Sequence, residues 1–165
     1  MEDLELESSQ PLFLTPEGHK RLQDELARLT TEKRAEIAER IRESKDHGEY
    51  SEDNSELDEV KIEQAIVENR INELKAVLSS ADILTNDQIP TDRVGLGSKV
   101  AVKDADRSVA FSIRMVASVE ADPDNDLISE ESPMGQALMG KKVGEIADFE
   151  APAGKLKYEV TKISR

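Results

Sequence analysis

The sequence predicts an α+β protein, in which an antiparallel coiled-coil hairpin of two helices precedes a small, mostly antiparallel β domain with one short helix. Apolar residues recur at heptad spacing before residue 80, and the apolar period falls toward two after residue 98. The 165-residue chain is 35% charged and only 37% hydrophobic. A compact globule of this length needs more apolar bulk, so we expect an elongated molecule with much solvated surface.

The composition also excludes several classes of function. The chain has 36 acidic and 22 basic residues, a net charge of −14, which argues against a general nucleic-acid-binding surface. It has no cysteine, so a disulfide framework, a thiolate zinc site and a cysteine nucleophile are excluded. No apolar run approaches the ~20 residues of a membrane helix, and the acidic start does not resemble a signal peptide. We therefore expect a cytoplasmic protein without a membrane segment.

The first helix should follow a polar tail at residues 1–13. Thr15-Pro16-Glu17 combines a helix-capping residue, a proline at the first helical position and an acid in the first turn. No further proline occurs before Gly48, so one long helix is expected. Its apolar residues form a narrow stripe that Lys33 interrupts: Leu22, Leu26, Leu29, Ile37 and Ile41.

The second helix is expected from about residues 53–55 to Ser80. Val60, Val67 and Leu74 recur every seven residues, which is typical of a coiled coil. A second set recurs at the same interval: Leu57, Gln64, Ile71 and Leu78. Two narrow stripes joined by a short turn bury each other, so residues 14–81 are predicted to form a hairpin domain, a rod roughly 40–45 Å long.

The remaining chain is predicted to be a linker at residues 82–97 and a β domain at residues 98–165. Asn86-Asp87, Pro90 and Gly95-Leu96-Gly97 are typical of loops. Alternating segments follow around Val100 and Val102, around Phe111 and Ile113, around Val116 and Val119, and at Leu127-Ile128. Ser132-Pro133-Met134-Gly135 should open a short helix whose apolar face is Ala137, Leu138 and Met139. Two closing strands, turned at Ala153-Gly154, complete the domain.

The acidic charge is concentrated at the turn between the helices. Residues 46–59 hold seven acids and no lysine or arginine: Asp46, Glu49, Glu52, Asp53, Glu56, Asp58 and Glu59. Such acids could simply cap the second helix and stabilise its dipole at a solvated tip. Alternatively, two or three of these carboxylates are presented to an external group. Clustered carboxylates suit Mg²⁺, but one cluster without an enclosing shell is half of an active site at most.

These residues resemble a known family. The run SKDHGEYSEDNSELDEVKIEQAIVENRI resembles the coiled-coil tip of the bacterial transcript-cleavage factors GreA and GreB, and is closer to GreA. The segment ISEESPMGQALMGKKVGEIADFEAPAGKLKYEVTKI resembles the same family's FKBP-like C-terminal domain. Thr15, Gly18 and Leu22 also fit the family, and the resemblance covers residues 13–165.

The resemblance implies a function in transcription. Gre factors insert the hairpin through the secondary channel of a backtracked RNA polymerase, and two tip acids help hold a second Mg²⁺ in the polymerase active centre. The polymerase then cuts its nascent RNA and resumes elongation. On this reading the chain is not itself an enzyme, binds no cofactor stably, contacts the RNA 3′ end inside the complex, and is a monomer.

Carried over by position, the resemblance implies three groups of site residues. The family reads G-D-x-x-E-N where this chain has one residue more, so the functional acid pair is ambiguous among Glu49, Glu52 and Asp53. Lys45 and Lys61 match basic positions that lie near the RNA in the family. Tyr50 is also expected near the RNA, not by resemblance but because an aromatic ring at the turn can stack on a base. The loop at Ser132, Pro133 and Met134 is expected to bind the rim of the polymerase channel.

Two other functions remain open from the sequence. The altered acidic tip could belong to an anti-cleavage relative that occupies the channel and inhibits the polymerase. The small β domain could alternatively be an FKBP-like prolyl isomerase or chaperone, although an aromatic pocket is hard to assemble from Phe111, Phe149 and Tyr158.

Overall fold

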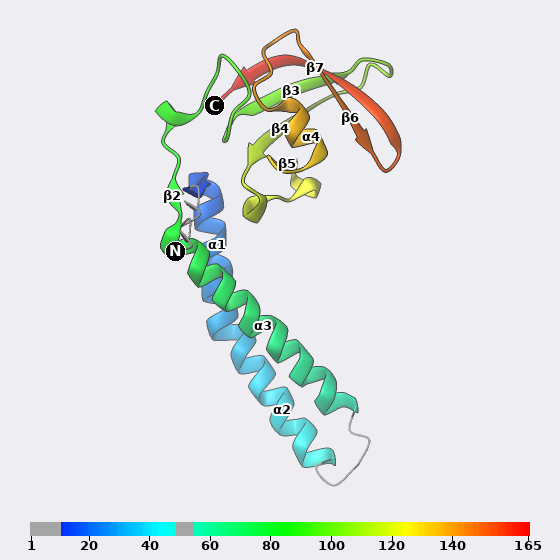
Figure 1. Cartoon of the computed structure of the whole chain (residues 1–165). Helices are drawn as coiled ribbons and strands as arrows, with labels where there is room; N and C mark the ends of the chain where they lie inside the picture. Colours follow the sequence, from blue (N-terminus) through cyan, green and yellow to red (C-terminus); the bar gives the residue numbers. More distant parts are fainter. Residues whose placement is uncertain (1–10, 49–54) are drawn as a thin grey trace, which may run out of the picture. The chain divides into compact units, whose positions relative to one another are not determined.

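A computed structural model describes residues 11–48 and 55–165 (Figure 1). The chain divides into two compact units. One holds the chain up to Gly18 together with Ala81–Arg165, and the other is His19–Ser80. The described part combines a long helical hairpin with a mixed β sheet and one short helix, which confirms the predicted α+β class.

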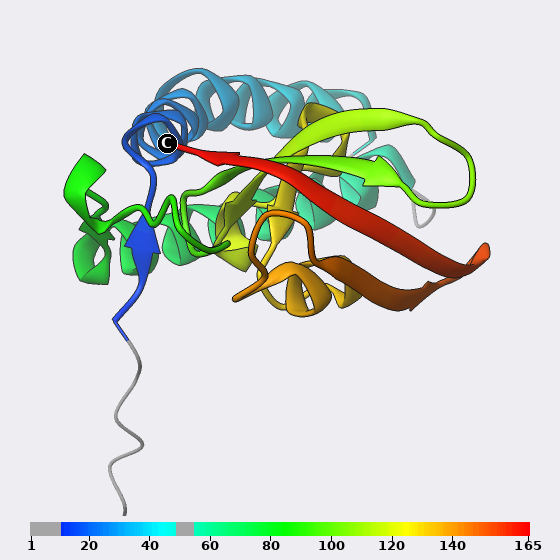
Figure 2. The same cartoon turned by 90° about the horizontal axis from the view of Figure 1, so that it is seen from above.

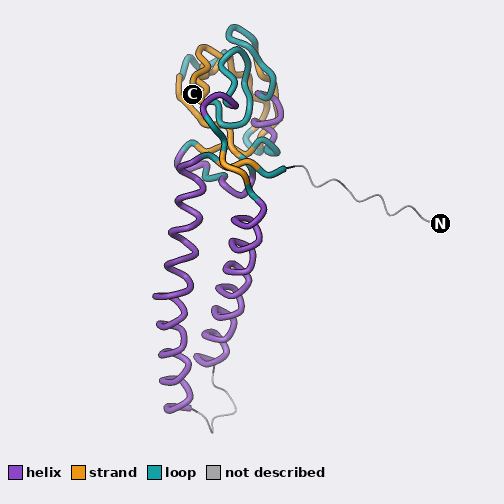
Figure 3. The backbone as a smooth tube through the Cα atoms, turned by 90° about the vertical axis from the view of Figure 1, so that its left-hand side faces the viewer, coloured by secondary structure: helices purple, strands orange, loops and turns teal. Residues whose placement is uncertain are grey.

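The His19–Ser80 unit is a hairpin of two long helical arms. The first arm consists of α1 (Pro16–Arg28), a five-residue π-helix (Leu29–Lys33) and α2 (Arg34–Gly48). The second arm is α3 (Ser55–Ser80), which lies alongside the first (Figure 3). At 1.5 Å per residue the 26 residues of α3 span about 39 Å. Among the described helices, none is both long enough and apolar enough to span a membrane.

The hairpin seam follows the predicted heptads, with one exception. Val60, Val67 and Leu74 are buried on α3, and Ile71 is buried beside them. Gln64, predicted in the seam, is exposed, because burying its amide against apolar neighbours without a hydrogen bond would cost free energy. The first arm buries Leu22, Leu29, Ile37 and Ser44.

A two-stranded parallel sheet forms from the two segments predicted to be a tail and a linker. Strand β1 (Phe13–Leu14) pairs with β2 (Asp82–Ile83). The predicted tail at 1–13 therefore ends in a paired strand, while residues 1–10 lie outside the described part. The predicted linker at 82–97 begins with β2 and continues through a 3₁₀ turn (Asn86–Gln88). Leu84, Ile89 and Val94 of this segment are buried, so it packs as part of its unit.

The main sheet has five strands in the order β5-β4-β3-β7-β6. They are β3 (Lys99–Asp104), β4 (Ala110–Val116), β5 (Leu127–Ser129), β6 (Ile146–Ala151) and β7 (Gly154–Ser164). Only the β4–β5 pairing within this sheet is parallel. Figure 2 shows β7 in red between the green β3 and the orange β6. The predicted, mostly antiparallel arrangement is confirmed.

One face of this sheet forms the hydrophobic core of its unit. Val100, Val102, Ile113, Met115 and Val160 alternate along the strands and are buried together with Leu138 of helix α4 (Pro133–Leu138). Val119, predicted in a strand, lies in a 3₁₀ turn (Ser118–Glu120). Met139 was predicted on the apolar face of the short helix. It ends that helix instead and is exposed, because α4 stops at Leu138.

Candidate functional site

The end of the hairpin is where the sequence places the candidate carboxylates. Helix α2 ends at Gly48 and α3 begins at Ser55. The end of α2 and the start of α3, which flank residues 49–54, therefore lie at the same end of the hairpin (Figure 3). Glu49, Tyr50, Glu52 and Asp53 lie outside the described residues. The acids that bracket them are all exposed, namely Asp46, Glu56, Asp58 and Glu59.

Lys45 and Lys61 are the two described residues predicted to lie near RNA. Lys45 is in the last turns of α2 and Lys61 is in the second turn of α3, and both are exposed. Neither forms an ion pair with any described residue. Their ammonium groups are therefore available to an external anion at the tip end of the hairpin.

Ion pairs between the arms stiffen the hairpin beyond its narrow apolar seam. Arg70 on α3 forms a bidentate pair with Glu25 on α1, with nitrogen–oxygen distances of 2.8 and 3.0 Å. The hydrogen bond from Arg70, opposed by partial burial, lowers the pKa of the Glu25 carboxyl. Closer to the tip, the Glu63 carboxylate of α3 forms ion pairs with both Lys33 and Arg40 of the first arm, with nitrogen–oxygen distances of 2.8 and 2.5 Å.

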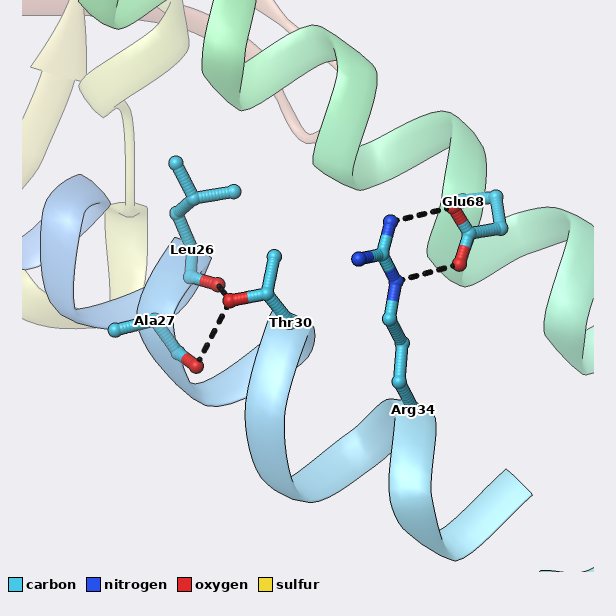
Figure 4. A network of polar contacts seen from close by, with 5 residues as sticks. All are labelled: Leu26, Ala27, Thr30, Arg34 and Glu68. Atoms are coloured by element: carbon cyan, nitrogen blue, oxygen red, sulfur yellow. Dashed lines mark hydrogen bonds and ion pairs between the residues drawn. The ribbon is translucent and has the colours of Figure 1, made fainter. Parts of the chain in front are cut away.

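The π-helix is the irregular element of the first arm. The Arg34 N–H donates to the Leu29 carbonyl five residues back, which is the π pattern. Such a turn interrupts the regular bonding of nearby carbonyls. The Thr30 hydroxyl donates to the Leu26 and Ala27 carbonyls at 2.8 and 3.2 Å (Figure 4). The Thr31 hydroxyl donates to the Ala27 carbonyl at 2.7 Å.

The seam spacing explains why this turn exists. Buried positions of the first arm, Leu22, Leu29, Ile37 and Ser44, follow one another at steps of seven, eight and seven residues. The extra residue in the middle step would turn a regular α-helix out of the seam, and the wider π turn absorbs it. Just after the π turn, Arg34 reaches Glu68 of α3 with two hydrogen bonds of 2.8 and 2.9 Å (Figure 4).

The predicted polymerase-binding loop is held by a local network. Ser132 caps α4: its hydroxyl accepts from the Gly135 N–H at 3.0 Å and donates to the Ser129 carbonyl at 2.7 Å. A Cβ on Gly135 would lie 1.9 Å from that carbonyl oxygen, so the close turn requires glycine. Pro133 is exposed, whereas Met134 is half-buried and packs against the core. The loop therefore presents Pro133 from a rigid support.

An open acidic hollow of about 400 Å³ lies beside this loop. Its lining is Glu130, Glu131, Gln136 and Met139. Partial burial, with a smaller contribution from the charge of Glu131, raises the pKa of the Glu130 carboxyl. Glu131 is itself tied back, because its carboxylate accepts from the Ser118 hydroxyl at 2.7 Å.

The aromatic side chains of the sheet domain pack on one another. The rings of Phe111 and Tyr158 meet edge to face at 5.2 Å between centroids, and Phe149 lies 5.5 Å from Tyr158. Phe111 and Tyr158 also pack against the hydrophobic core. These contacts use the rings for packing, which does not favour the prolyl isomerase alternative.

One contact was absent from the sequence expectations. Glu120 is buried, and its carboxylate accepts from the Thr15 N–H at 2.9 Å and from the Thr15 hydroxyl at 2.5 Å. The Thr15 hydroxyl accepts in turn from the Gly18 N–H, as the predicted cap requires. Glu120 is 105 residues away from Thr15 in the chain, so no local pattern could have revealed the pair.

Comparison with known protein families gives a match for each of the two parts of the chain. A family model described as "Transcription elongation factor, N-terminal" matches residues 12–83, and one described as "Transcription elongation factor, GreA/GreB, C-term" matches residues 89–165. Together they cover nearly the whole sequence. The chain belongs to the GreA/GreB family of transcription elongation factors.

Two relatives named GreA agree with this family. The chain is 45% identical over 157 residues to the transcription elongation factor GreA of Thermoanaerobacter pseudethanolicus, covering 95% of this chain and 99% of the relative. It is 47% identical over 154 residues to GreA of Alkaliphilus oremlandii, covering 93% and 96%. A solved structure of GreA factor homolog 1 from Thermus thermophilus is 32% identical, with a TM-score of 0.44, over 94% of this chain and all of that one.

Proposed function

We propose that this protein is a transcription elongation factor that binds RNA polymerase, enters its secondary channel and stimulates cleavage of backtracked nascent RNA. One observation carries the proposal: a narrow two-helix hairpin brackets the acidic segment 49–54 in a chain 45–47% identical to proteins named transcription elongation factor GreA. The catalyst in this proposal is the polymerase, in the cytoplasm, and this chain acts on it as a monomer.

The hairpin suits delivery through a narrow opening. Its cross-section is two helices, and α3 alone is about 39 Å long. The described ion pairs that link the arms, such as Arg70–Glu25 and Arg34–Glu68, oppose splaying. A stiff support matters because a carboxylate misplaced by an ångström loses much of its effect in a reaction centre.

The tip acids supply the chemistry in this proposal. Two of Glu49, Glu52 and Asp53 would complete the oxygen shell of a Mg²⁺ shared with the polymerase active centre. In phosphodiester hydrolysis such an ion activates water and stabilises charge on the phosphate oxygens. In this proposal the carboxylates of this chain hold and orient the Mg²⁺, and they form no covalent bond with the RNA.

The remaining predicted residues would anchor the complex. Lys45 and Lys61, exposed on the arms next to the tip, would contact phosphates at the RNA 3′ end. Tyr50 would stack on a base. The Ser132-Pro133-Met134 loop would bind the channel rim, with Pro133 as its exposed contact.

A transcript-cleavage assay tests this function. A backtracked complex of the cognate polymerase with 5′-labelled RNA should shorten its RNA when the protein is added. Of the separate variants Glu49→Ala, Glu52→Ala and Asp53→Ala, the two that remove a member of the functional pair should abolish shortening, whereas Glu56→Ala, which removes an exposed acid just beyond the segment, should retain it. RNA of unchanged length with the wild-type protein would refute the proposal. Inhibited nucleotide addition would instead support the anti-cleavage alternative, which the GreA relatives do not favour.

A further inference from the structure

Three cations share the solvent-facing side of the five-stranded sheet. Val100 and Ile113 point into the core, so their strand neighbours Lys99 and Arg114 point outward. Ile163 of β7 is also buried, which turns Lys162 outward beside them. We name Lys99, Arg114 and Lys162 the basic triad.

The triad brings like charges together on adjacent strands. Lys99 lies directly opposite Arg114. The Arg114 N–H bonds away from β3, to the Asp126 carbonyl at 2.8 Å, so the pair is of the non-hydrogen-bonded type whose side chains approach most closely. Like charges in such a position are destabilising. Lys162 pairs with Ala101, two residues along β3 from Lys99, and extends the cluster to a third strand.

None of the three cations has an acidic partner within the described part of the chain. No ion pair with a described residue involves Lys99, Arg114 or Lys162. The far end of the same sheet differs, because Lys157 lies opposite Asp148 and Lys155 lies opposite Glu150. Acidic residues outnumber basic ones in this chain, which has a net charge of −14, and yet no acidic residue lies opposite a member of the triad on a neighbouring strand.

A hollow of about 390 Å³ adjoins the cation pair. Ser112, Asn125 and Leu127 line it together with Lys99, Arg114 and Asp126. Short side chains leave room around the cations, since Ser164 lies opposite Lys99 on β7 and Ala101 is the next outward-facing residue along β3. Arg114 is half-buried, which reduces the solvent screening of its charge.

We infer that the basic triad binds an acidic segment of a protein partner, through carboxylates that enter the hollow beside Arg114. Arginine binds a carboxylate with two parallel hydrogen bonds, and Lys99 and Lys162 can neutralise a second one. Asp126, which also lines the hollow, repels carboxylates and phosphates alike and does not distinguish them. An extended nucleic-acid backbone fits less well for another reason: it carries a charge on every nucleotide and would meet Glu159 farther along β7, whereas an acidic segment need place only one or two carboxylates beside Arg114. The inference rests on the proposed function, which makes RNA polymerase the partner.

Charge reversal with a matched control tests the inference. The variant Lys99→Glu/Arg114→Glu is compared with Lys155→Glu/Lys157→Glu, which changes net charge equally on the same sheet. Binding to cognate core RNA polymerase is measured by competition with labelled wild-type protein at several salt concentrations. The first variant should bind about tenfold more weakly with a flatter salt dependence, and the control within about twofold of wild type.

Further variants separate the possible outcomes. Lys99→Gln/Arg114→Gln removes the repulsion, so it should melt no lower than wild type and still bind more weakly. Equal binding by the wild type and the Lys99/Arg114 variants, or equal weakening by the control, would overturn the inference. So would triad-dependent binding to an RNA–DNA scaffold without polymerase. If the wild type shortens RNA while the variants bind normally, the inference fails and the proposed function stands.

Discussion

The buried carboxylate of Glu120 is held by the residues that begin α1. Both of its oxygens accept hydrogen bonds from Thr15, and the Gly18 N–H completes the cap on the Thr15 hydroxyl. A Cβ on Gly18 would lie 1.8 Å from one Glu120 oxygen. Glycine at position 18 is therefore required by close approach to a side chain that cannot move without losing two hydrogen bonds.

Gly18→Ala should destabilise the protein by about 2 kcal/mol, because the added carbon displaces the Glu120 carboxylate. Glu120→Ala should cost about 1–3 kcal/mol, since it leaves two Thr15 donors without their partner. Urea unfolding followed by near-ultraviolet circular dichroism measures both changes. In the double variant Gly18→Ala/Glu120→Ala, the added methyl group no longer meets a carboxylate. The loss of unfolding free energy in the double variant should therefore be well below the sum of the two single losses. Additive costs would show that the two residues do not interact.

At the scale of the elements, the π turn keeps the first arm in register with α3. Its extra residue lies between Leu29 and Ile37, and the hydroxyls of Thr30 and Thr31 donate to carbonyls of the preceding turn. Deleting Thr31 should restore a step of seven residues and yield a continuous α-helix with the seam intact. Deleting Ala38 instead leaves steps of seven, eight and six, which no single π turn corrects.

Thermal unfolding followed by far-ultraviolet circular dichroism distinguishes the two deletions. The Thr31 deletion should change the free energy of unfolding by less than about 1 kcal/mol, whereas the Ala38 deletion should cost several times more because Ser44 leaves the seam. Equal losses would contradict the role given to the π turn.

The ion pairs between the arms predict an acid-sensitive hairpin. The pKa of Glu25 is lowered in the folded protein, chiefly by its hydrogen bond to Arg70. The folded state therefore binds this proton less readily than the unfolded chain. The resulting stability is present at neutral pH and is lost as pH falls through the lowered pKa.

Glu25→Gln should consequently lower stability at pH 7 and much less at strongly acidic pH, so its gap from wild type narrows on acidification. Unfolding measured in urea at a series of pH values tests this. Glu32→Gln, which changes an exposed acid without an ion pair to any described residue, should show no such narrowing. A pH-independent gap for Glu25→Gln would contradict the prediction.

For the whole molecule, local sequence patterns predicted the elements better than their long-range contacts. The heptads of α3 and the Thr15 cap were predictable because they depend on neighbours within a few residues. The pairing of Phe13 with Asp82 and the burial of Glu120 were not, since each joins residues far apart in the chain. The π turn had a readable signal in the seven-eight-seven spacing, which the interruption at Lys33 obscured. The residues of the candidate carboxylate site came from resemblance and lie outside the described residues, so their geometry stays a prediction.

The central claim is that the hairpin delivers its acidic tip over a set distance. Removing one heptad from each arm, residues 38–44 and 57–63, keeps the seam phase and shortens the hairpin by about 10 Å. The measurement is the length of labelled nascent RNA in a backtracked complex, with binding to polymerase followed by competition. We predict that the shortened protein still competes with the wild type for polymerase but leaves the RNA uncut, whereas the wild type shortens it. Cleavage by the shortened protein at the wild-type rate would contradict the account.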